Sequence, residues 1–521
     1  MFWRITLFRI LRGPKRTLLV GETLALALIL LTAGYLRLQN VGQNPGWYSD
    51  EGTNLDVASH LAHEQVQYMA LGQSTLLVSR LPIFETLLEL AVRLWGESMA
   101  TLRTLTGLLG TLSVGVLYGC VRRITGKPVL ALLAAFFLAV YPQAVLYSRF
   151  GFSYNLLPPF VMLSFVGLWE YLQNGRRSAL AFAAGMIGLG TLSEVWMLAL
   201  VPPFGLVVLW RRWRDAWWSL PLLGLPFALY SLWMVTHVAQ AFTLDMQFVF
   251  FRVSNLPLPQ QLHNVVLNYT TLLSQDFWMP CAVVGFILLH PARLRNLTLL
   301  WFFLTLIILG RTIALYSLSA HYMIPLLPFV AFGTASLVHR GLPYLWWQIA
   351  GSLQSAGRLP SLFLCASVCL FLVLSPFVLS LWLDMDHVRS GFPTAIDPFL
   401  TDPAQAQQVA AYLNANIQTD DLVIVNPALS WLLHARTADM QMAIAATGEG
   451  TVHFPPNIPL DRWVYDPRLE KARYVVIDNF WTRWAIPNIP QAGAIIAQVE
   501  RWPEVFQTSD FAVYHNPAWS S

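Results

Sequence analysis

Charged residues are scarce in this sequence. They make up 12% of the 521 residues, whereas apolar residues make up 56%. Soluble domains usually carry about 25% charged residues, so this chain lacks the polarity to cover an ordinary water-facing surface. The composition therefore excludes an ordinary soluble protein and predicts an integral membrane protein. The net charge is only +4 and no basic run exceeds a few residues, so we expect no nucleic-acid partner.

Cysteine is also scarce, and its spacing does not indicate a zinc centre. The four cysteines all lie in apolar segments, without the close paired spacing of zinc ligands: Cys120, Cys281, Cys365 and Cys369. Packed or lipid-facing thiols are the expected interpretation. The sequence also lacks a glycine-rich phosphate loop and an internal repeat, so it gives no sign of a nucleotide-binding or repeat protein.

Long apolar segments are abundant, and a helix that spans a membrane needs about 20 such residues. We predict eleven spans, at roughly 17–39, 104–121, 129–147, 156–173, 179–193, 195–210, 217–236, 277–290, 297–315, 322–338 and 361–383. The fifth and sixth are short, so a single long tilted helix is an alternative for that pair. The fold class is therefore an α-helical polytopic membrane protein.

The basic residues of the short loops predict the orientation. With eleven spans, most basic residues of the N-terminus and the short loops fall on one side of the membrane. These are Arg4, Arg9, Arg12, Lys15, Arg16, Arg122, Arg123, Lys127, Arg176, Arg177, Arg211, Arg212, Arg214, Arg293, Arg295, Arg340 and Arg358. The opposite short loops hold isolated arginines at positions 149, 252 and 311. Positive loops stay in the cytoplasm, so we expect a multi-pass plasma-membrane protein with a cytoplasmic N-terminus. The first span is too long for a cleavable signal peptide.

Two segments are then expected on the outer side. The first outer loop, about 40–100, contains "LPIFETLLELAVRLWGESM" and, more weakly, "NLDVASHLAHEQVQYMAL", which have the pattern of helices lying in the membrane interface. The tail contains a helical segment, "PAQAQQVAAYLNANI", and the strand-like segments "DLVIVNP", "ARYVVIDN" and "FAVYHN". We therefore divide the chain into a transmembrane module, 1–383, and a small extracytoplasmic α/β domain, 384–521.

Asp50 and Glu51 stand side by side where the first span reaches the outer face. They have a structural interpretation, since acids at the start of a helix stabilise it. A chemical interpretation rests on their neighbours, because the topology places cationic and phenolic groups on the same membrane face. These are Arg80, Arg149, His321 and Tyr322.

Several stretches together resemble a known family. After "DE" come "SRLPIF", "GESMATLRTLTGLLGTLSVGVLYGCVRRITG" with Arg103 near its outer end, "ALLAAFFLAVYPQAVLYSRFG" and "HYMIPLLPFVAFGTASL". In order and topology they resemble the polytopic glycosyltransferases of the C fold, of the protein O-mannosyltransferase and lipid A aminoarabinose transferase type (glycosyltransferase family 39). The resemblance covers about residues 15–175 well and 315–340 moderately.

The resemblance implies transfer of a sugar from a polyprenyl-phosphate carrier to a protein, lipid or glycan acceptor at the outer face. The attacking hydroxyl must lose a proton, which needs a general base, and Asp50 is our candidate. Glu51 either orients Asp50 or binds the acceptor. The leaving phosphate gains charge, which fixed cations stabilise, so Arg80 is the first candidate for the phosphate and Arg149 the second. His321 or Tyr322 would add a hydrogen bond.

The sequence departs from the family pattern at two places. Tyr154 and Asn155 stand where many relatives have an acid, and Asn155 can bind a sugar hydroxyl but cannot act as a base. Ser79 stands where some relatives have a glutamate before the basic residue. We therefore predict sugar or acceptor contacts at positions 154 and 155, no metal and no other cofactor.

Other polar residues receive mainly structural interpretations. Glu194 is expected at an outer turn, and His434 and His453 as ordinary surface or packed histidines. Asp245, in an outer loop, is a weaker candidate for lining a site. A membrane transporter or flippase, and a glycan polymerase or ligase, remain as alternative functions. A transporter would place its polar groups near the bilayer midplane, often within inverted repeats.

Overall fold

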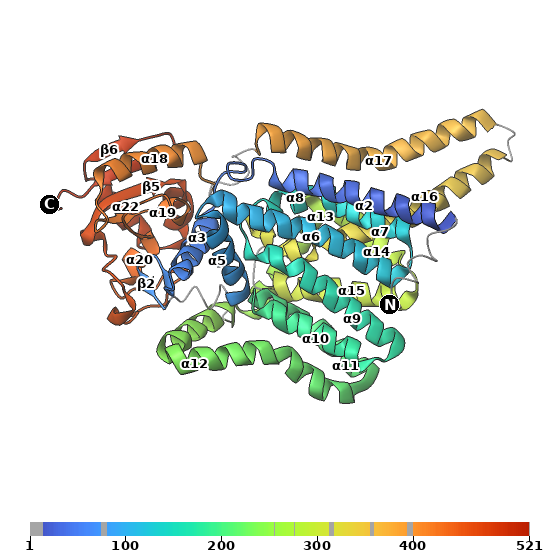
Figure 1. Cartoon of the computed structure of the whole chain (residues 1–521), viewed down its shortest axis with the longest axis horizontal. Helices are drawn as coiled ribbons and strands as arrows, with labels where there is room; N and C mark the ends of the chain where they lie inside the picture. The colour runs from blue at the N-terminus through green and yellow to red at the C-terminus, as the bar shows by residue number, and fades with distance from the viewer. Residues whose placement is uncertain are drawn as a thin grey trace, which may run out of the picture.

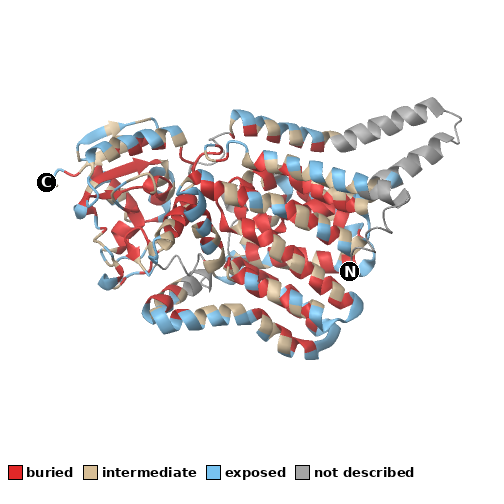
Figure 2. Ribbon diagram, viewed as in Figure 1, coloured by how far each residue is buried: buried red, intermediate tan, exposed pale blue. Residues whose placement is uncertain are grey.

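The computed structural model describes residues 14–73, 81–254, 256–275, 277–311, 317–354, 359–392 and 400–519. Figure 1 shows a bundle of long helices and, at one end of it, a separate domain built around a sheet. Buried residues fill the interior of both parts, and exposed residues lie on the outward faces of the helices (Figure 2). The chain is thus a polytopic helical protein with a small α/β domain at its C-terminal end.

Every predicted span coincides with helical structure over most of its described residues, and residues 312–315 of the ninth span lie outside the described part of the chain. The helices of the bundle are α2 (Pro14–Leu38), α6 (Met99–Thr125), α7 (Pro128–Val140), α8 (Pro142–Ser148), α9 (Leu157–Asn174), α10 (Arg177–Thr191), α11 (Val201–Arg212), α12 (Ala216–Ser254), α13 (Leu258–Gln275), α14 (Trp278–Ile287), α15 (Ala292–Gly310), α16 (Leu327–Gln354) and α17 (Leu359–Ser390). Five helical segments of the described chain are long and apolar enough to cross a membrane, or six if the bent pair α7 and α8 forms one span. The count of eleven spans therefore stays a prediction.

The short segments 179–193 and 195–210 do not merge into one helix. The first is α10, and the second is a 3₁₀ helix, η2 (Val195–Leu200), followed by α11. Within the described part of the bundle, α13 lies outside the predicted spans, in a segment that the sequence predicts to be an outer loop. Its polar residues Gln260, Gln261 and Asn264 lower its hydropathy, although Leu258, Leu262 and Val266 are exposed.

The outward face of α2 shows why this bundle needs a lipid environment. Leu24, Leu28 and Leu31 are 60%, 65% and 70% exposed and are spaced to lie along one stripe of the helix. A stripe of exposed leucines is unfavourable in water and favourable against acyl chains. The opposite side of α2 packs on α6 and α7, where Ala33 and Leu36 are wholly buried.

The C-terminal domain contains a five-stranded mixed sheet. Its strand order is β4 (Arg436–Ala438), β3 (Leu422–Ile424), β5 (Ala472–Asp478), β7 (Phe511–His515) and β6 (Glu504–Gln507). Strand β3 runs parallel to its neighbours β4 and β5, and strand β7 runs antiparallel to its neighbours β5 and β6. Helix α18 (Pro403–Asn416) begins where the Asp402 side chain accepts two backbone N–H groups. The predicted helix and three strands are confirmed, whereas the short edge strands β4 and β6 were missed.

The segment between α2 and α6 joins the two parts. It comprises α3 (Ser49–Ala62), a two-stranded hairpin of β1 (Gln67–Tyr68) and β2 (Leu71–Gly72), and α5 (Pro82–Trp95). Helix α3 packs against the short helix α19 (Pro427–Ser430) of the C-terminal domain. The approach is so close at Gly52 that a Cβ atom would lie 1.8 Å from the carbonyl oxygen of Pro427. Only glycine permits this contact.

The prediction that α3 lies in the membrane interface is wrong. Nine of its residues, from Ser49 to Ala58, are buried between the bundle and the C-terminal domain. A pair of backbone hydrogen bonds, each 2.8 Å, joins Trp47 just before α3 to Thr401. The sequence pattern could not distinguish the two positions, because a buried helix and an interfacial helix have similar patterns of apolar residues. Helix α5 does keep an exposed apolar edge at Leu90 and Leu94.

Candidate active site

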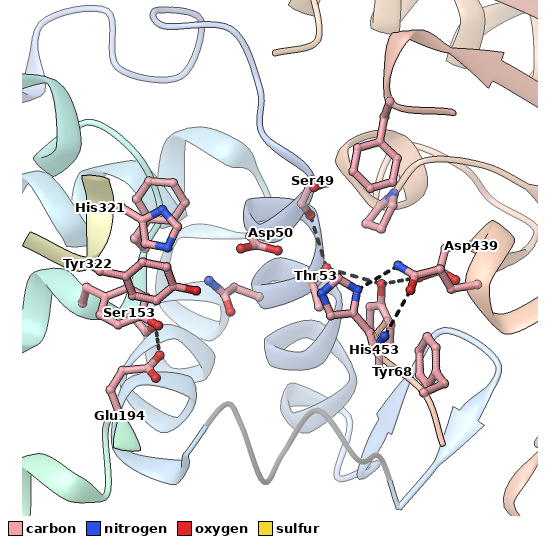
Figure 3. A pocket seen from close by; sticks show the side chains of 17 residues that line it. Ser49, Asp50, Thr53, Tyr68, Ser153, Glu194, His321, Tyr322, Asp439 and His453 are labelled. Carbon is pink, nitrogen blue, oxygen red and sulfur yellow. Dashed lines mark hydrogen bonds between the residues drawn. The ribbon is translucent and has the colours of Figure 1, made fainter. Parts of the chain in front are cut away.

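A cavity of about 200 Å³ lies between the bundle and the C-terminal domain. Figure 3 shows Asp50 near its middle, with bundle residues on one side and residues of the C-terminal domain on the other. Three parts of the chain that are far apart in sequence therefore build one site. The bundle contributes Phe152, Ser153, Tyr154, Glu194, His321 and Tyr322. The segment between α2 and α6 contributes Ser49, Asp50, Thr53, Asn54 and Tyr68, and the C-terminal domain contributes Pro427, Asp439, Gln441, His453, Phe454 and Phe480.

Asp50 is held at the start of α3. The backbone N–H of Tyr48 donates to Glu51 Oε2 over 2.9 Å, which closes the first turn of the helix. Successive residues of a helix point about 100° apart, so the two neighbouring acids face different surroundings. Glu51 turns into the protein, and Asp50 is half-buried and lines the cavity.

Glu51 does not line the cavity. Both of its oxygens accept from Arg103, with Nε–Oε1 2.7 Å and Nη2–Oε2 2.5 Å, and both side chains are wholly buried. The backbone N–H of Gly151 also donates to Glu51 Oε1, over 2.6 Å. The same guanidinium donates to the carbonyls of Val41, Pro45 and Gly46. The pair thus ties the loop before α3, the loop after α8 and the start of α3 together.

Aromatic rings form the bundle side of the cavity. His321 stacks on Phe152 with ring centroids 4.6 Å apart, and Tyr154 lies 5.2 Å from both His321 and Tyr322. The indole N–H of Trp196 donates to the carbonyl of Tyr322 over 2.9 Å and fixes the backbone there. Three predicted site residues, Tyr154, His321 and Tyr322, are therefore brought together with Asp50.

A second carboxylate faces the same space. Glu194 is buried and accepts a hydrogen bond from Ser153, which also lines the cavity. The prediction of a turn is right for the backbone, since residues 192–194 separate α10 from η2. The sequence did carry one signal for this residue, namely an acid that stands between two apolar segments.

The C-terminal domain supplies polar groups that the sequence analysis missed. The hydroxyls of Thr53 and Tyr68 lie 3.3 Å apart, and the Tyr68 hydroxyl donates to Asp439 Oδ2 over 3.3 Å. Burial raises the pKa of the Asp439 carboxyl to about 6. Gln441 Nε2 lies 2.8 Å from Nδ1 of His453, which lines the cavity although the sequence predicts an ordinary surface or packed histidine.

The structure does not bring Arg149 and Asn155 to the cavity. The Arg149 guanidinium is buried and donates to the carbonyls of Leu36, Gln39 and Asn44 over 2.7, 2.8 and 2.7 Å. The Asn155 amide donates to the carbonyls of residues 147, 150 and 152. Both side chains therefore brace the loops that carry the site. Arg80 lies outside the described residues.

The remaining candidates lie elsewhere. Asp245 does not line the cavity but forms a buried ion pair with Arg462, with Oδ1–Nη1 3.3 Å. His434 is exposed. Across the described ranges, no group of three or more His, Cys, Asp or Glu side chains is arranged to hold a metal ion. That the protein needs no metal stays a prediction.

Known proteins share this architecture. The chain has 14% identity and a TM-score of 0.65 to the crystal structure of ArnT from Cupriavidus metallidurans bound to undecaprenyl phosphate, over 96% of this chain and 98% of that one. The chain has 13% identity and a TM-score of 0.53 to the crystal structure of the oligosaccharyltransferase of Archaeoglobus fulgidus in its apo form. That comparison covers 90% of this chain and 72% of the other. No curated protein matches by sequence.

The chain is a polytopic membrane protein with the C-type glycosyltransferase fold. Within it, residues 79–239 match the family model described as dolichyl-phosphate-mannose-protein mannosyltransferase. The resemblance that the sequence showed to this group of glycosyltransferases is confirmed.

Proposed function

We propose that this protein is a membrane glycosyltransferase that moves a sugar from a polyprenyl-phosphate carrier to an acceptor at the outer face of the plasma membrane. The observation that carries the proposal is the position of Asp50. Its carboxylate faces a cavity walled on one side by the outer end of the bundle and on the other by the C-terminal domain. A lipid-linked donor can reach such a cavity from the bilayer while an acceptor enters from the water.

The donor occupies the bundle side of the cavity. ArnT, which shares the fold, has been crystallised with undecaprenyl phosphate. His321 and Tyr322 offer hydrogen-bond donors to the phosphate, and Arg80 remains the predicted cation. Tyr154 and the Ser153–Glu194 pair contact the transferred sugar. Arg149 and Asn155 act indirectly, by bracing the loops around them.

The chemistry is a direct displacement. The acceptor hydroxyl oxygen attacks the anomeric carbon while the bond from that carbon to the phosphate oxygen breaks. The hydroxyl proton passes to Asp50, and the polyprenyl phosphate leaves with the bonding electron pair. Because the attack comes from the face opposite the phosphate, the product has inverted anomeric configuration. A positioned general base contributes about 10²–10⁴-fold to such a step.

The proposal is tested with the purified chain in lipid nanodiscs. A panel of polyprenyl-phosphate hexoses and pentoses is offered with mixed acceptors, and mass spectrometry follows release of the polyprenyl phosphate. NMR of the glycosidic linkage reports the anomeric configuration. We expect one donor to be consumed with inversion, and chelator to leave the rate unchanged. Consumption of no donor, or retention of configuration, would overturn the proposal.

A further inference from the structure

The half of the cavity built by the C-terminal domain differs in chemistry from the half built by the bundle. Phe480 and His453 both line it, and both rings stack on Trp484. The Phe480 and Trp484 centroids are 4.6 Å apart with planes at 16°, and those of His453 and Trp484 are 5.8 Å apart with planes at 10°. Rings that are stacked in this way form a stiff wall, because none can rotate without disturbing its neighbour.

Polar groups stand beside this aromatic wall and are themselves held in place. Gln441 and His453 are linked twice, since the backbone N–H of His453 also donates to Gln441 Oε1 over 3.2 Å. The Asp439 carboxylate caps the next helix through the N–H of Met442 at 2.7 Å and accepts from Tyr68. An amide, an imidazole and a carboxylate in fixed positions can both donate to and accept from hydroxyl groups.

The C-terminal half of the lining carries one carboxylate, Asp439, and none of its described residues is a lysine or an arginine. A phosphate or uronate held in this half would lie beside the Asp439 carboxylate without a lysine or arginine to pair with, and like charges placed together are unfavourable. A neutral group with many hydroxyls would instead find hydrogen-bond partners there.

We propose that the C-terminal half of the cavity is an acceptor subsite for an uncharged sugar unit, so that the enzyme extends a neutral glycan. The C–H face of a sugar ring is apolar and packs on an aromatic wall, while its hydroxyls bind Gln441, His453 and Asp439. The inference rests on the proposed function, because it names the acceptor of that same site. It also assigns a task to the C-terminal domain, which is to hold the acceptor sugar within reach of Asp50.

Binding and transfer are measured separately, so that the two proposals fail in different ways. Saturation-transfer NMR on the intact chain in nanodiscs tests a panel of neutral disaccharides, maltose 1-phosphate and a serine-rich neutral peptide. We expect at least one neutral disaccharide to bind, and the phosphate and the peptide to give no signal. This experiment needs no donor and no turnover.

Variants then locate the binding. Gln441→Ala and Phe480→Ala should each weaken the binding of the neutral sugar by about tenfold or more, as expected from the loss of one hydrogen bond or one stacking contact. Phe480→Trp should retain binding because it keeps an aromatic ring at this position. Its retained binding would show that Phe480→Ala acts through loss of the ring. Matched controls are Gln498→Ala, on an exposed face of the same domain, and Phe506→Ala, whose ring stacks on Tyr412 away from the cavity.

The kinetic arm uses the same variants with an active donor. Gln441→Ala should raise the KM for the acceptor by about tenfold, whereas Gln498→Ala should leave that KM unchanged. Preferred binding of the phosphorylated sugar or the peptide, no binding of any neutral sugar, or equal effects of the control variants would overturn the inference. A chain that binds neutral sugars but uses no polyprenyl-phosphate donor would contradict the proposed function and leave the sugar subsite standing.

Discussion

The carboxylate of Glu51 and the guanidinium of Arg103 form an ion pair in which neither side chain is exposed, with Oε2 2.5 Å from Nη2. The pair sits directly beside Asp50 in the chain and joins three backbone segments. Glu51, the acid next to the proposed base, therefore has a structural role, which is to fix the position of the start of α3 beside the cavity.

Breaking this pair should destabilise the protein strongly. Glu51→Gln leaves the Arg103 charge buried without its counter-ion, which costs about 3–5 kcal/mol. The measurement is thermal unfolding of the purified chain in detergent. The exposed pair between Arg93 and Glu89, with N–O 2.9 Å, provides the control, since Arg93→Met should cost less than about 1 kcal/mol. Similar shifts in the unfolding midpoint for both variants would contradict the anchoring role.

Arg149 should behave as a structural residue rather than as a phosphate ligand. Its guanidinium donates to three carbonyls, and lysine lacks the planar fork to satisfy them. We expect Arg149→Lys to lower the unfolding midpoint while the folded protein keeps its KM for the donor. Tyr322→Phe and His321→Ala should show the reverse, with a KM for the donor about tenfold higher and little change in stability. Donor titrations and melting curves on the three variants decide between the two roles.

The sequence was sufficient to group four of the residues that line the cavity. Asp50, His321 and Tyr322 were grouped because membrane topology puts the outer ends of spans on one face, whichever helices carry them, and Tyr154 followed from the family resemblance. Membrane topology does not distinguish between two residues that are adjacent in the sequence. It could not say which of Asp50 and Glu51 faces the cavity, because this depends on the rotation of α3 and on the position of Arg103.

The wall of the cavity that the C-terminal domain forms could not be predicted. Asp439, Gln441 and His453 reach the cavity only because the C-terminal domain docks on α3 through the close contact at Gly52. Such docking is a long-range event, and nothing in the local pattern around these residues differs from an ordinary loop or helix start. The fold itself was more accessible, since apolar length alone marks a spanning helix.

The stability of the C-terminal domain should depend on pH through Asp439. Burial raises the pKa of its carboxyl to about 6, above the value of about 3.9 in an unfolded chain. The folded state therefore holds the proton more tightly. The stabilisation that this proton gives is fully present below pH 4 and is lost as the pH rises through 6, a change of about 1–3 kcal/mol.

Asp439→Asn removes this titration and keeps a side-chain oxygen for the helix cap. The variant should therefore be more stable than the parent at pH 7 and close to it at pH 4.5, as measured by the difference in unfolding midpoint at each pH. Asp466→Asn is the control with the opposite sign, because Arg468 holds the pKa of that carboxyl below its usual range. A difference between parent and Asp439→Asn that does not change with pH would refute the assignment.

The orientation of the chain gives a further test. The basic loops predict a cytoplasmic N-terminus, and an odd number of spans puts the C-terminal domain outside. Alkaline phosphatase fused after Ser521 should be active, and a fluorescent protein that folds only in the cytoplasm should stay dark at that position. The opposite pattern would place the cavity on the cytoplasmic side and exclude an acceptor from the outer face.

The most direct test of the central claim is the Asp50→Asn variant, because it keeps the shape of the side chain and removes the base. Transfer should fall by at least about 10²-fold and up to 10⁴-fold, while the affinity for the polyprenyl-phosphate donor and the unfolding midpoint stay unchanged. Asp402→Asn is the matched control, since Asp402 only caps α18 and asparagine caps equally well. Its transfer rate should equal that of the parent. If Asp50→Asn folds normally and transfers sugar at nearly the parental rate, Asp50 is only a residue in the first turn of α3, and the proposed mechanism is wrong.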